Sequence, residues 1–447
     1  MSIEETSPLT AAQRIDELMK IHPRGFDLSL ERIQDLLRKL GNPQDKLPPI
    51  IHFAGTNGKG SAIAFTRAIL EAAGLSVHVD TSPHLVNWHE RYRLGVKGGA
   101  GKLVEDEVLS DAIARVAEAN GGQPITVYEV LTAVAFLLFS EWPADVCLIE
   151  VGLGGRFDST NVMETTDISV ITPVSIDHEA YLGDTLAKIA FEKAGIIKKD
   201  TPLVIGPQED EALNVIIRQA ARNRAATSIS GQTFTAMREN GRLVYQDEYA
   251  LLDMALPRLP GEHQISNAAT AITTCRLFCQ MHGIVLSDAM LDEGLQNADW
   301  PARMQHLTHG KLIDAMPETC DVWLDGGHNP GAGEMIAQFL SDLEERDPRP
   351  LTMVCGMLNT KDTSGYFRQF ETLAERVITV PITSSDAGID PETLADQAEN
   401  AGLPAVAAPS LQRALQMIDG AQPNRVLICG SLYLAGDMLQ QNETPPV

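Results

Sequence analysis

Short apolar runs alternate with helix-length segments along the first half of the chain. The runs that we predict as buried strands are Ile50–Ala54, Val77–Thr81, Val146–Val151, Ile168–Thr172 and Leu203–Ile205. The segments that we predict as helices are Ser61–Ala73, Glu129–Glu141 and Thr185–Ile197. Because strands that alternate with helices are typical of a parallel sheet covered by helices, the pattern predicts an α/β domain.

The alternation stops between about residues 228 and 259 and then resumes. β-prone pieces such as Arg242–Tyr245 predict a hairpin or meander there, before a helix at Gln264–His282. Further strands are predicted at Val322–Asp325, Leu351–Cys355, Val377–Val380 and Val426–Cys429. A chain of 447 residues is also long for one hydrophobic core. We therefore expect two domains, residues 1–303 with a mostly parallel sheet and residues 304–447 with a smaller, Rossmann-like α/β fold.

The charge balance excludes some classes of partner. The chain has 35 Lys and Arg against 60 Asp and Glu, a net charge of −25. No broad basic surface can be assembled from this balance, so we expect neither a nucleic-acid nor a membrane partner. Anionic substrates must therefore meet a local positive site. The composition, 44% hydrophobic and 5% aromatic, is that of a soluble globular enzyme.

The ends of the chain and its cysteines suggest a location. No apolar leader segment and no run of membrane-spanning length is present, so we expect a cytoplasmic protein. Cys275 and Cys279 are one helical turn apart, but no second pair accompanies them as in a metal site. We interpret the six cysteines as reduced residues of the core.

A glycine-rich turn joins the first predicted strand to the first predicted helix. Its residues are Gly55-Thr56-Asn57-Gly58-Lys59-Gly60-Ser61. Glycines let backbone N–H groups face an anion, Lys59 can reach the outer phosphates, and Ser61 can hold a magnesium ion. The Walker spacing is not met, because Gly60 separates Lys59 from Ser61. The loop thus predicts phosphate binding, and a turn without a ligand remains the alternative.

Polar side chains also follow other predicted strands. Ser82 follows the second strand, Glu150 ends the third, and His178 follows the fourth. Small molecules that bind open α/β sheets lie at the carboxyl ends of the strands. A Mg²⁺ ion that is bound mainly by phosphates needs only one or two coordinating side chains from the protein. Glu150 and His178 are therefore candidate metal or catalytic residues. Lys193 lies in a predicted helix, and its position alone predicts a solvated lysine.

Taken together, the motifs resemble those of folylpolyglutamate synthase and the bifunctional dihydrofolate synthase, members of the Mur ligase superfamily. Besides the glycine-rich turn, the segments that carry the resemblance are Ser82–His84, Glu150–Asp158, Asp177–Gly183, Glu192–Ile196, Asn267–Ala268, Trp300–Arg303, Asp325–Pro330 and Gly430–Tyr433. They occur in this order over nearly the whole chain. The implied fold is α/β, a P-loop-containing ATPase domain followed by a C-terminal glutamate ligase domain.

The resemblance implies a reaction. ATP would phosphorylate a substrate carboxylate, and the amino group of L-glutamate would attack the resulting acyl phosphate. Two Mg²⁺ ions would assist, one held by Ser82 and Glu150 and the other by His178. Lys193 would be carbamylated and would help to organise the second ion, whereas Lys59 would stabilise phosphate charge.

The resemblance also implies the binding residues. ATP would contact Asn57, Gly58, Lys59, Gly60, Ser61, Asn267, Arg303, Asp325 and His328. Dihydropteroate or a folate would contact Asp27, Leu28, Ser29, Leu30, Val127, Tyr128, Glu129, Val130, Phe157, Asp158 and Ser159. Ser29, Ala302 and Gly327 depart from the family pattern by exchanges among small residues, which put substrate preference in doubt more than chemistry.

Three alternatives stay open. A monofunctional folylpolyglutamate synthase would share every motif. Another Mur-type amino-acid ligase would share the ATP and metal residues, but only about 49 residues precede the loop, too few for a leading UDP-binding domain. A non-catalytic nucleotide switch would not need Glu150, His178 and Lys193 together. We expect a monomer that acts on small molecules, namely dihydropteroate, folates and L-glutamate.

Overall fold

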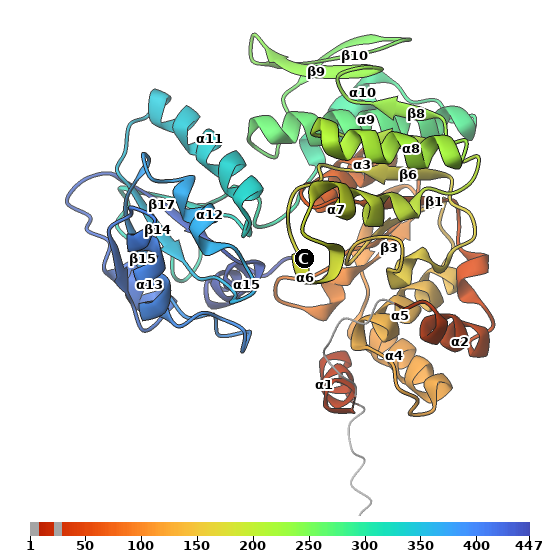
Figure 1. Cartoon of the computed structure of the whole chain (residues 1–447), viewed down its shortest axis with the longest axis horizontal. Helices are drawn as coiled ribbons and strands as arrows, with labels where there is room; N and C mark the ends of the chain where they lie inside the picture. The colour runs from red at the N-terminus through yellow and green to blue at the C-terminus, as the bar shows by residue number, and fades with distance from the viewer. Residues whose placement is uncertain (1–8, 22–28) are drawn as a thin grey trace, which may run out of the picture.

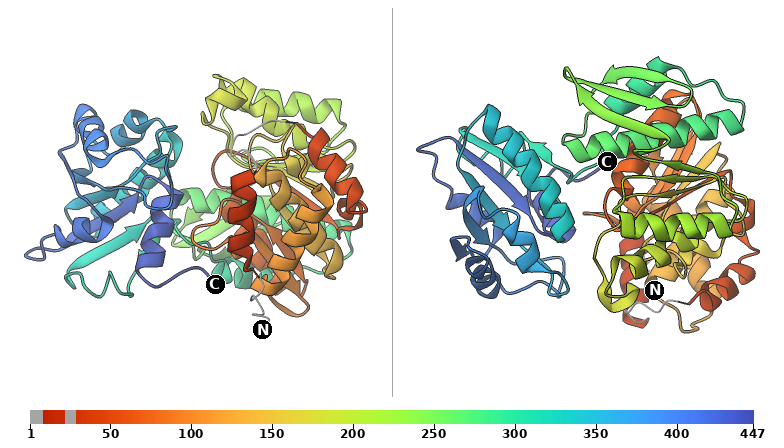
Figure 2. Two further views of the ribbon diagram at one scale, coloured as in Figure 1. Left: turned by 90° about the horizontal axis from the view of Figure 1, so that it is seen from below. Right: turned by 45° about the horizontal axis from the view of Figure 1, so that its top comes forward.

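The computed structural model describes residues 9–21 and 29–447, and it places them in two lobes that lie side by side (Figures 1 and 2). The larger lobe is built on a sheet with the strand order β4-β3-β2-β5-β1-β6-β7-β8. Its strands are β1 (Ile50–Ala54), β2 (Val77–Asp80), β3 (Tyr92–Val96), β4 (Gly99–Leu103), β5 (Val146–Glu150), β6 (Ile168–Ile171), β7 (Leu203–Ile205) and β8 (Thr227–Ile229). The six neighbouring strands β2, β5, β1, β6, β7 and β8 pair in parallel. Strands β3 and β4 extend the sheet beyond β2 and pair antiparallel.

Helices cover both faces of this sheet, because alternate residues of each strand point to opposite sides. Ile51 and Phe53 of β1 face a core formed with α3 (Lys59–Ala72), α9 (Glu262–Met281) and α10 (Asp288–Asn297). The opposite face packs on two groups of helices. These are α1 (Ala11–Ile21), α2 (Glu31–Lys39), α4 (Asp106–Asn120) and α5 (Val127–Glu141), and then α7 (Leu186–Lys193) and α8 (Asp210–Arg222).

A small antiparallel meander lies over α9 at the top of Figure 1. It consists of β9 (Phe234–Glu239), β10 (Arg242–Asp247) and β11 (Leu251–Ala255). The Tyr245 hydroxyl lies 3.0 Å from that of Thr273 on α9, and Arg276 on α9 pairs with Asp247 at 2.9 Å. The predicted meander is therefore confirmed, and apolar packing together with these contacts fixes it on the helix.

The smaller lobe has its own sheet with the order β12-β13-β17-β14-β15-β16. Its strands are β12 (Gln305–Leu307), β13 (Cys320–Leu324), β14 (Leu351–Cys355), β15 (Ala374–Thr379), β16 (Ala405–Ala407) and β17 (Asn424–Cys429). All pairs are parallel except β12 with β13. Helices α11 (Pro330–Arg346), α12 (Thr363–Arg368) and α13 (Pro391–Asn400) cover one face, and α14 (Leu411–Gln416) and α15 (Leu432–Gln441) the other.

The predicted α/β class and the separate Rossmann-like C-terminal sheet are confirmed. The chain crosses from one sheet to the other between α10 and β12, and the predicted boundary after Arg303 falls within this crossing. The antiparallel strands β3 and β4 were not predicted, because their many glycines and polar residues hide the strand pattern. All six cysteines are free, and five are buried, in agreement with reduced core residues. No helix in the described part of the chain is long and apolar enough to cross a bilayer.

Candidate active site

The glycine-rich turn joins the central strand β1 to α3, so that it emerges at the carboxyl end of the parallel sheet. Gly58 has a φ of 84° and forms the N-cap of α3. The Lys59 ammonium folds back over the loop, donating to the Gly55 carbonyl at 3.1 Å, and lies 3.7 Å from Oε1 of Glu150. The helix N-terminus and this lysine together form a positive cradle suited to phosphate.

Lys193 ends α7 and points into the same loop. Its side chain is buried, and its Nζ donates to the Gly55 carbonyl at 2.8 Å. Burial, together with the charge of Lys59, lowers the pKa of Lys193 to about 7. The alternative of a solvated lysine is therefore wrong. A large fraction of Lys193 is a neutral amine near neutral pH, the form that reacts with CO₂.

The other candidate metal residues line the same cavity. Glu150 is buried at the end of β5, next to β1, and one of its oxygens accepts the backbone N–H of Ser82 at 3.0 Å. Burial raises the pKa of Glu150, opposed by Lys59. Ser61, in the first turn of α3, accepts a hydrogen bond from Gln264 at 3.3 Å. The hydroxyl and carboxylate oxygens among these groups are ligands that suit Mg²⁺ when phosphates complete its coordination shell.

His178 follows β6 and has a left-handed backbone with a φ of 54°. Burial and the nearby Lys361 and His328 lower the pKa of His178 to about 4, against the opposing effect of Asp177. The imidazole is thus neutral at physiological pH, as metal ligation requires. Among the described residues, no three His, Cys, Asp or Glu side chains gather closely enough to hold a metal ion by themselves.

Asp177 connects the two lobes. Its carboxylate lies 2.8 Å from Nζ of Lys361 and 3.7 Å from Nε2 of His328, both in the smaller lobe. These contacts hold the pKa of Asp177 well below its usual range, although burial opposes them. Asn329 adds a bridge, because its amide donates to Asn57 of the phosphate loop at 3.2 Å. The smaller lobe thus reaches the phosphate loop directly.

The predicted adenine residue, Asn267, lies on α9 against the phosphate loop. It is buried and donates to Gln264 at 3.0 Å. An added Cβ on Gly58 would lie 2.5 Å from the Asn267 amide oxygen. The missing side chain of Gly58 is therefore what allows α9 to approach the loop.

Arg303 lies in the segment that joins the lobes, between Ala302 and Met304, whose φ angles of 56° and 42° are left-handed. Asp325 is buried at the end of β13 and accepts the backbone N–H of Met304 and that of Gly327, each at 2.7 Å. Asp325 therefore fixes the crossing segment beside Arg303. Burial raises the pKa of Asp325, with Arg303 opposing.

A cavity of about 540 Å³ joins these groups, which is in the range of small-molecule sites. The residues that line it include all the predicted nucleotide and metal residues: Asn57, Gly58, Lys59, Gly60, Ser61, Ser82, Glu150, His178, Lys193, Asn267, Arg303, Asp325 and His328. The prediction from sequence thus selected residues that the fold brings to one cavity formed by both lobes.

A second cavity, of about 440 Å³, opens beside the first and shares Ser82 and Pro83 with it. Ser29, Val127, Tyr128, Glu129, Phe157, Asp158 and Ser159 are among its lining residues. Asp158 is buried beside Tyr128 and accepts the backbone N–H groups of Leu153 and Thr160 at 2.8 and 2.9 Å. Arg156 lies over the Phe157 ring at 4.3 Å, so that Phe157 gives the cavity an aromatic wall held by a cation outside its lining.

Three of the predicted acceptor residues have positions within the helices around this cavity. Glu129 forms a capping box with Thr126 at the start of α5 and pairs with Arg32 at 3.2 Å. Val130 is fully buried in the core and Leu30 is the N-cap residue of α2, and neither lines the cavity. Asp27 and Leu28 lie outside the described residues.

Several residues of the site were not selected from the sequence. Lys361 follows β14 and reaches both Asp177 and the acceptor cavity. His263 and Gln264, at the start of α9, line the nucleotide cavity. Burial lowers the pKa of His263 to about 4. For Lys361 a signal was available, since it lies just beyond the carboxyl end of a buried strand, like Ser82 and His178.

Two protein-family models match segments of both lobes of the chain. Residues 53–275 match the family model of the Mur ligase middle domain, and residues 309–441 match the model named dihydrofolate synthetase, C-terminal domain. The probable dihydrofolate synthetase of Schizosaccharomyces pombe is 30% identical over 92% of this chain and 98% of its own length. The Bacillus subtilis dihydrofolate synthase/folylpolyglutamate synthase is 33% identical over 80% of this chain and 82% of its own length.

Solved structures extend the similarity to three dimensions. Escherichia coli FolC in complex with DHPP and ADP superposes with a TM-score of 0.84 at 28% identity, covering 97% of each chain. The Yersinia pestis bifunctional folylpolyglutamate synthase/dihydrofolate synthase, complexed with AMPPNP and a manganese ion, gives 0.83 at 28% identity over 98% of this chain and 99% of its own. The likeness therefore covers both lobes.

Proposed function

The chain belongs to the dihydrofolate synthase/folylpolyglutamate synthase family of Mur-type ligases, which joins glutamate at the expense of ATP in folate metabolism, and we propose that it glutamylates two acceptors, dihydropteroate and tetrahydrofolate. The second, acceptor-sized cavity carries this proposal. Tyr128, Phe157 and Asp158 offer it an aromatic surface and a buried carboxylate. The cavity meets the nucleotide cavity at Ser82, where the acceptor carboxylate would approach ATP.

ATP and divalent metal use follow from the nucleotide cavity and from relatives solved with ADP, or with AMPPNP and manganese. We propose two Mg²⁺ sites, one at Ser82 and Glu150 with Ser61 nearby, the other at His178. When bound, the ions would offset the repulsion between the phosphates and the acceptor carboxylate. Lys59 and Arg303 add fixed positive charge where the transferring phosphoryl group becomes more negative.

We propose further that Lys193 is carbamylated. Its neutral amine nitrogen would bond to the carbon of CO₂ and lose one proton to solvent, which leaves an N-carboxylate anion in place of a lysine in a buried site. The anion would help to hold the ion at His178. The 2.8 Å contact with Gly55 fixes the lysine on the phosphate loop, which supports this role.

The two lobes, taken as residues 1–303 and 304–447, would close over the reactants. The Asp177–Lys361 and Asn57–Asn329 contacts already join the lobes next to the phosphate loop. Closure would exclude water from the acyl phosphate, which water otherwise hydrolyses.

The deciding experiment compares acceptors. Phosphate release is measured with ATP, Mg²⁺ and L-glutamate, with dihydropteroate or tetrahydrofolate as the acceptor. We expect glutamate-dependent phosphate release with both acceptors. Lys59→Ala should abolish it, whereas Lys46→Ala, which removes an exposed lysine that lines neither cavity, should not.

Activity with only one acceptor, or with neither, would change the proposed function. Activity with tetrahydrofolate alone would leave a monofunctional folylpolyglutamate synthase, and activity with dihydropteroate alone a monofunctional dihydrofolate synthase. The curated relatives include a Lacticaseibacillus casei protein of the first name and the S. pombe protein of the second. Inactivity with both acceptors would overturn the proposal.

A further inference from the structure

A buried histidine on the central strand takes no part in the proposed mechanism. His52 lies in the middle of β1, three residues before the glycine-rich turn, and its side chain is fully buried. Burial, together with the charge of Lys198, lowers the pKa of His52 to about 3, so the imidazole is neutral at physiological pH. Central strands of this kind are built mainly from apolar residues, such as the neighbouring Ile51 and Phe53. The polar side chain at position 52 therefore needs an explanation.

A chain of hydrogen bonds leads from His52 to the acceptor cavity. The Nε2 atom of His52 lies 2.9 Å from the hydroxyl oxygen of Thr160, which is also fully buried. The Thr160 hydroxyl donates to Oδ1 of Asp158 at 2.6 Å, and the Thr160 backbone N–H donates to the same oxygen at 2.9 Å. Because a hydroxyl has a single proton to donate, the bond between His52 and Thr160 must run from Nε2–H to the hydroxyl oxygen.

This direction fixes the tautomer of His52. With its proton on Nε2, the imidazole has an acceptor at Nδ1, and that atom has no hydrogen-bond partner among the residues that the structure describes. A buried acceptor without a partner lowers stability, and a leucine at this position would avoid that loss. A residue that is kept against stability is typical of a functional site, and the bond from Nε2–H to Thr160 is what His52 contributes there.

Asp158, at the end of this chain, lines the acceptor cavity. Its other oxygen, Oδ2, accepts the backbone N–H of Leu153 at 2.8 Å, so both carboxylate oxygens are held. Burial raises the pKa of Asp158, and the hydrogen bonds from Thr160 and Leu153 oppose this effect. The chain that begins at His52 therefore favours the ionised carboxylate and fixes its rotation at the cavity wall.

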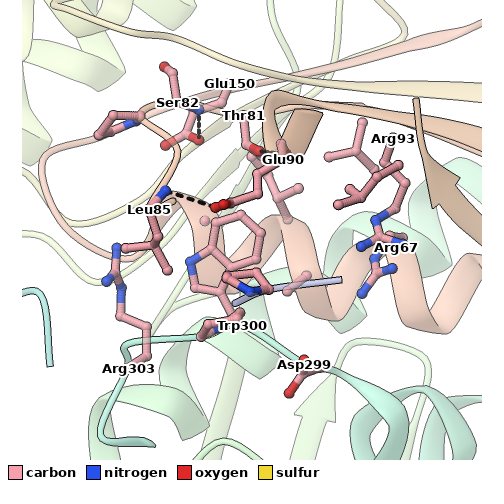
Figure 3. A pocket seen from close by; sticks show the side chains of 18 of the residues that line it. Arg67, Thr81, Ser82, Leu85, Glu90, Arg93, Glu150, Asp299, Trp300 and Arg303 are labelled. Atoms are coloured by element: carbon pink, nitrogen blue, oxygen red, sulfur yellow. Dashed lines mark hydrogen bonds between the residues drawn. The ribbon is translucent and has the colours of Figure 1, made fainter. Parts of the chain in front are cut away.

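The same chain links the acceptor cavity to the phosphate loop. His52 belongs to the strand that continues into the turn with Lys59, whereas Asp158 belongs to the loop that follows β5. Figure 3 shows Ser82, which lines both cavities, with its backbone N–H bonded to Glu150 at the end of β5. Reacting groups that are displaced by about 1 Å lose much of their rate. The link therefore sets where an acceptor bound at Asp158 lies relative to the phosphate loop.

We propose that His52 and Thr160 are positioning residues for the Asp158 carboxylate. Thr160 holds the carboxylate ionised and in one orientation toward the acceptor, and His52 holds the Thr160 hydroxyl. Neither residue lines either cavity in the described part of the chain, so each acts through its neighbour. The inference rests on the proposed function, because it needs an acceptor that contacts Asp158.

The test removes each hydrogen bond with little change of side-chain shape. Thr160→Val deletes the hydroxyl, and Thr160→Ser keeps it. His52→Leu deletes the donor, and His52→Gln keeps an N–H group near the position of Nε2. Thr274→Val on α9 is the matched control, because it deletes an equally buried hydroxyl that donates to the Thr270 carbonyl of its own helix at 2.7 Å.

The KM values for dihydropteroate and tetrahydrofolate are measured at saturating ATP and L-glutamate, together with ADP affinity and the melting temperature. Thr160→Val should raise the acceptor KM about tenfold or more and lower kcat, with ADP affinity within about twofold of wild type. Thr160→Ser and His52→Gln should recover most of the loss seen in Thr160→Val and His52→Leu. The double variant of Thr160→Val and His52→Leu should be no worse than Thr160→Val, because His52 acts through Thr160.

Several results would overturn the positioning role. One is an acceptor KM within about twofold of wild type in Thr160→Val and His52→Leu. Another is an equal loss of acceptor and ADP affinity, or equal effects of Thr160→Ser and Thr160→Val, because these mark a purely structural role. Additive losses in the double variant would overturn the part of His52.

If Thr160→Val does not fold, the comparison of His52→Leu with His52→Gln decides by the same criteria. A wild-type chain that turns over neither acceptor would overturn the proposed function, and the positioning role would fall with it. An active wild type with unaffected variants would overturn the positioning role alone.

Discussion

Lys361 of the smaller lobe places its Nζ 2.8 Å from Oδ1 of Asp177 in the larger lobe. Both side chains are largely buried, with exposed fractions of 8% and 11%. The pair lies beside His178 and His328, so it joins the lobes at the candidate reaction centre. A buried pair of this kind is costly to break on one side only, because the remaining charge loses its partner.

We therefore expect Lys361→Met and Asp177→Asn each to lower turnover and to loosen the contact between the lobes. A double-mutant cycle on urea unfolding should give a coupling of about 1–3 kcal/mol. The exposed Lys311–Glu443 pair within the smaller lobe is the control and should couple by less than about 1 kcal/mol. Coupling near zero for Asp177 and Lys361 would contradict an interlobe contact in solution.

Lys193→Ala should lose most turnover, because the site would lose the carboxylate of the proposed carbamate. Added short carboxylic acids such as acetate or propionate should restore part of it by filling the space left by the side chain. Lys198 offers a control. Burial lowers its pKa to about 8, but its Nζ contacts the Asn161 carbonyl at 3.3 Å instead of the phosphate loop. Rescue of Lys198→Ala, or full activity of Lys193→Ala, would count against the carbamate.

The pH dependence of activity should reflect the Lys193 amine. Its pKa is about 7, so the neutral form that reacts with CO₂ increases as the pH rises through 7. Turnover should rise from pH 6 to 8, and added bicarbonate should raise it most at the low end. His178, with a pKa of about 4, is already neutral there and adds nothing to this limb. A pH profile unmoved by bicarbonate would argue against the modification.

The same group affects stability. Between pH 7 and 10.5 the unfolded lysine keeps its proton while the folded one has lost it, so the unfolded state binds more protons. The contribution of Lys193 to the free energy of unfolding therefore rises with pH across this window. Urea unfolding of the wild type and of Lys193→Met at pH 7 and 9 measures this contribution. The free energy of unfolding of the wild type should increase more between the two pH values than that of Lys193→Met.

Gly58→Ala should weaken nucleotide binding. The new Cβ would lie 2.5 Å from the Asn267 amide oxygen, so either α9 or the phosphate loop must move. Gly74 is a matched control, because its φ of 85° is nearly the same and nothing lies within 4 Å of an added Cβ. In both variants the left-handed conformation of the new alanine costs roughly 1–2 kcal/mol of stability. Isothermal titration with ADP should show a loss of affinity in Gly58→Ala only.

Glu129→Gln should act on stability and leave the KM of the acceptor nearly unchanged. The carboxylate caps α5 and pairs with Arg32, so its loss should cost about 1 kcal/mol. Thr126→Ala removes the other half of the capping box and should cost a similar amount. If Glu129→Gln instead raised the acceptor KM with unchanged stability, the carboxylate would contact the substrate, as the family resemblance implies.

The sequence predicted best what depends on local pattern. The strands β1, β5 and β6 are continuous apolar runs, and the polar residues after them meet because parallel strands end at one edge of a sheet. This is why Lys59, Glu150 and His178 could be selected together. Lys193 was different, since only the resemblance separated it from an ordinary helical lysine, and its burial depends on α7 packing against the loop.

Contacts between distant segments could not be predicted in the same way. Asp177 and Lys361 are separated by 184 positions, and their pairing depends on how the lobes are placed. The capping role of Glu129 was readable in principle, since Thr126 stands three residues before it, the spacing of a capping box.

The crossing segment ties the position of the lobes to the charge at the phosphates. Ala302 and Met304 hold left-handed angles on either side of Arg303, and Asp325 anchors Met304. Arg303 therefore has little freedom to adjust independently of the smaller lobe. A rotation of the smaller lobe would move Arg303 relative to the nucleotide cavity, because Asp325 of that lobe holds the adjacent Met304. The charge that Arg303 brings to the nucleotide cavity thus depends on how the two lobes are placed.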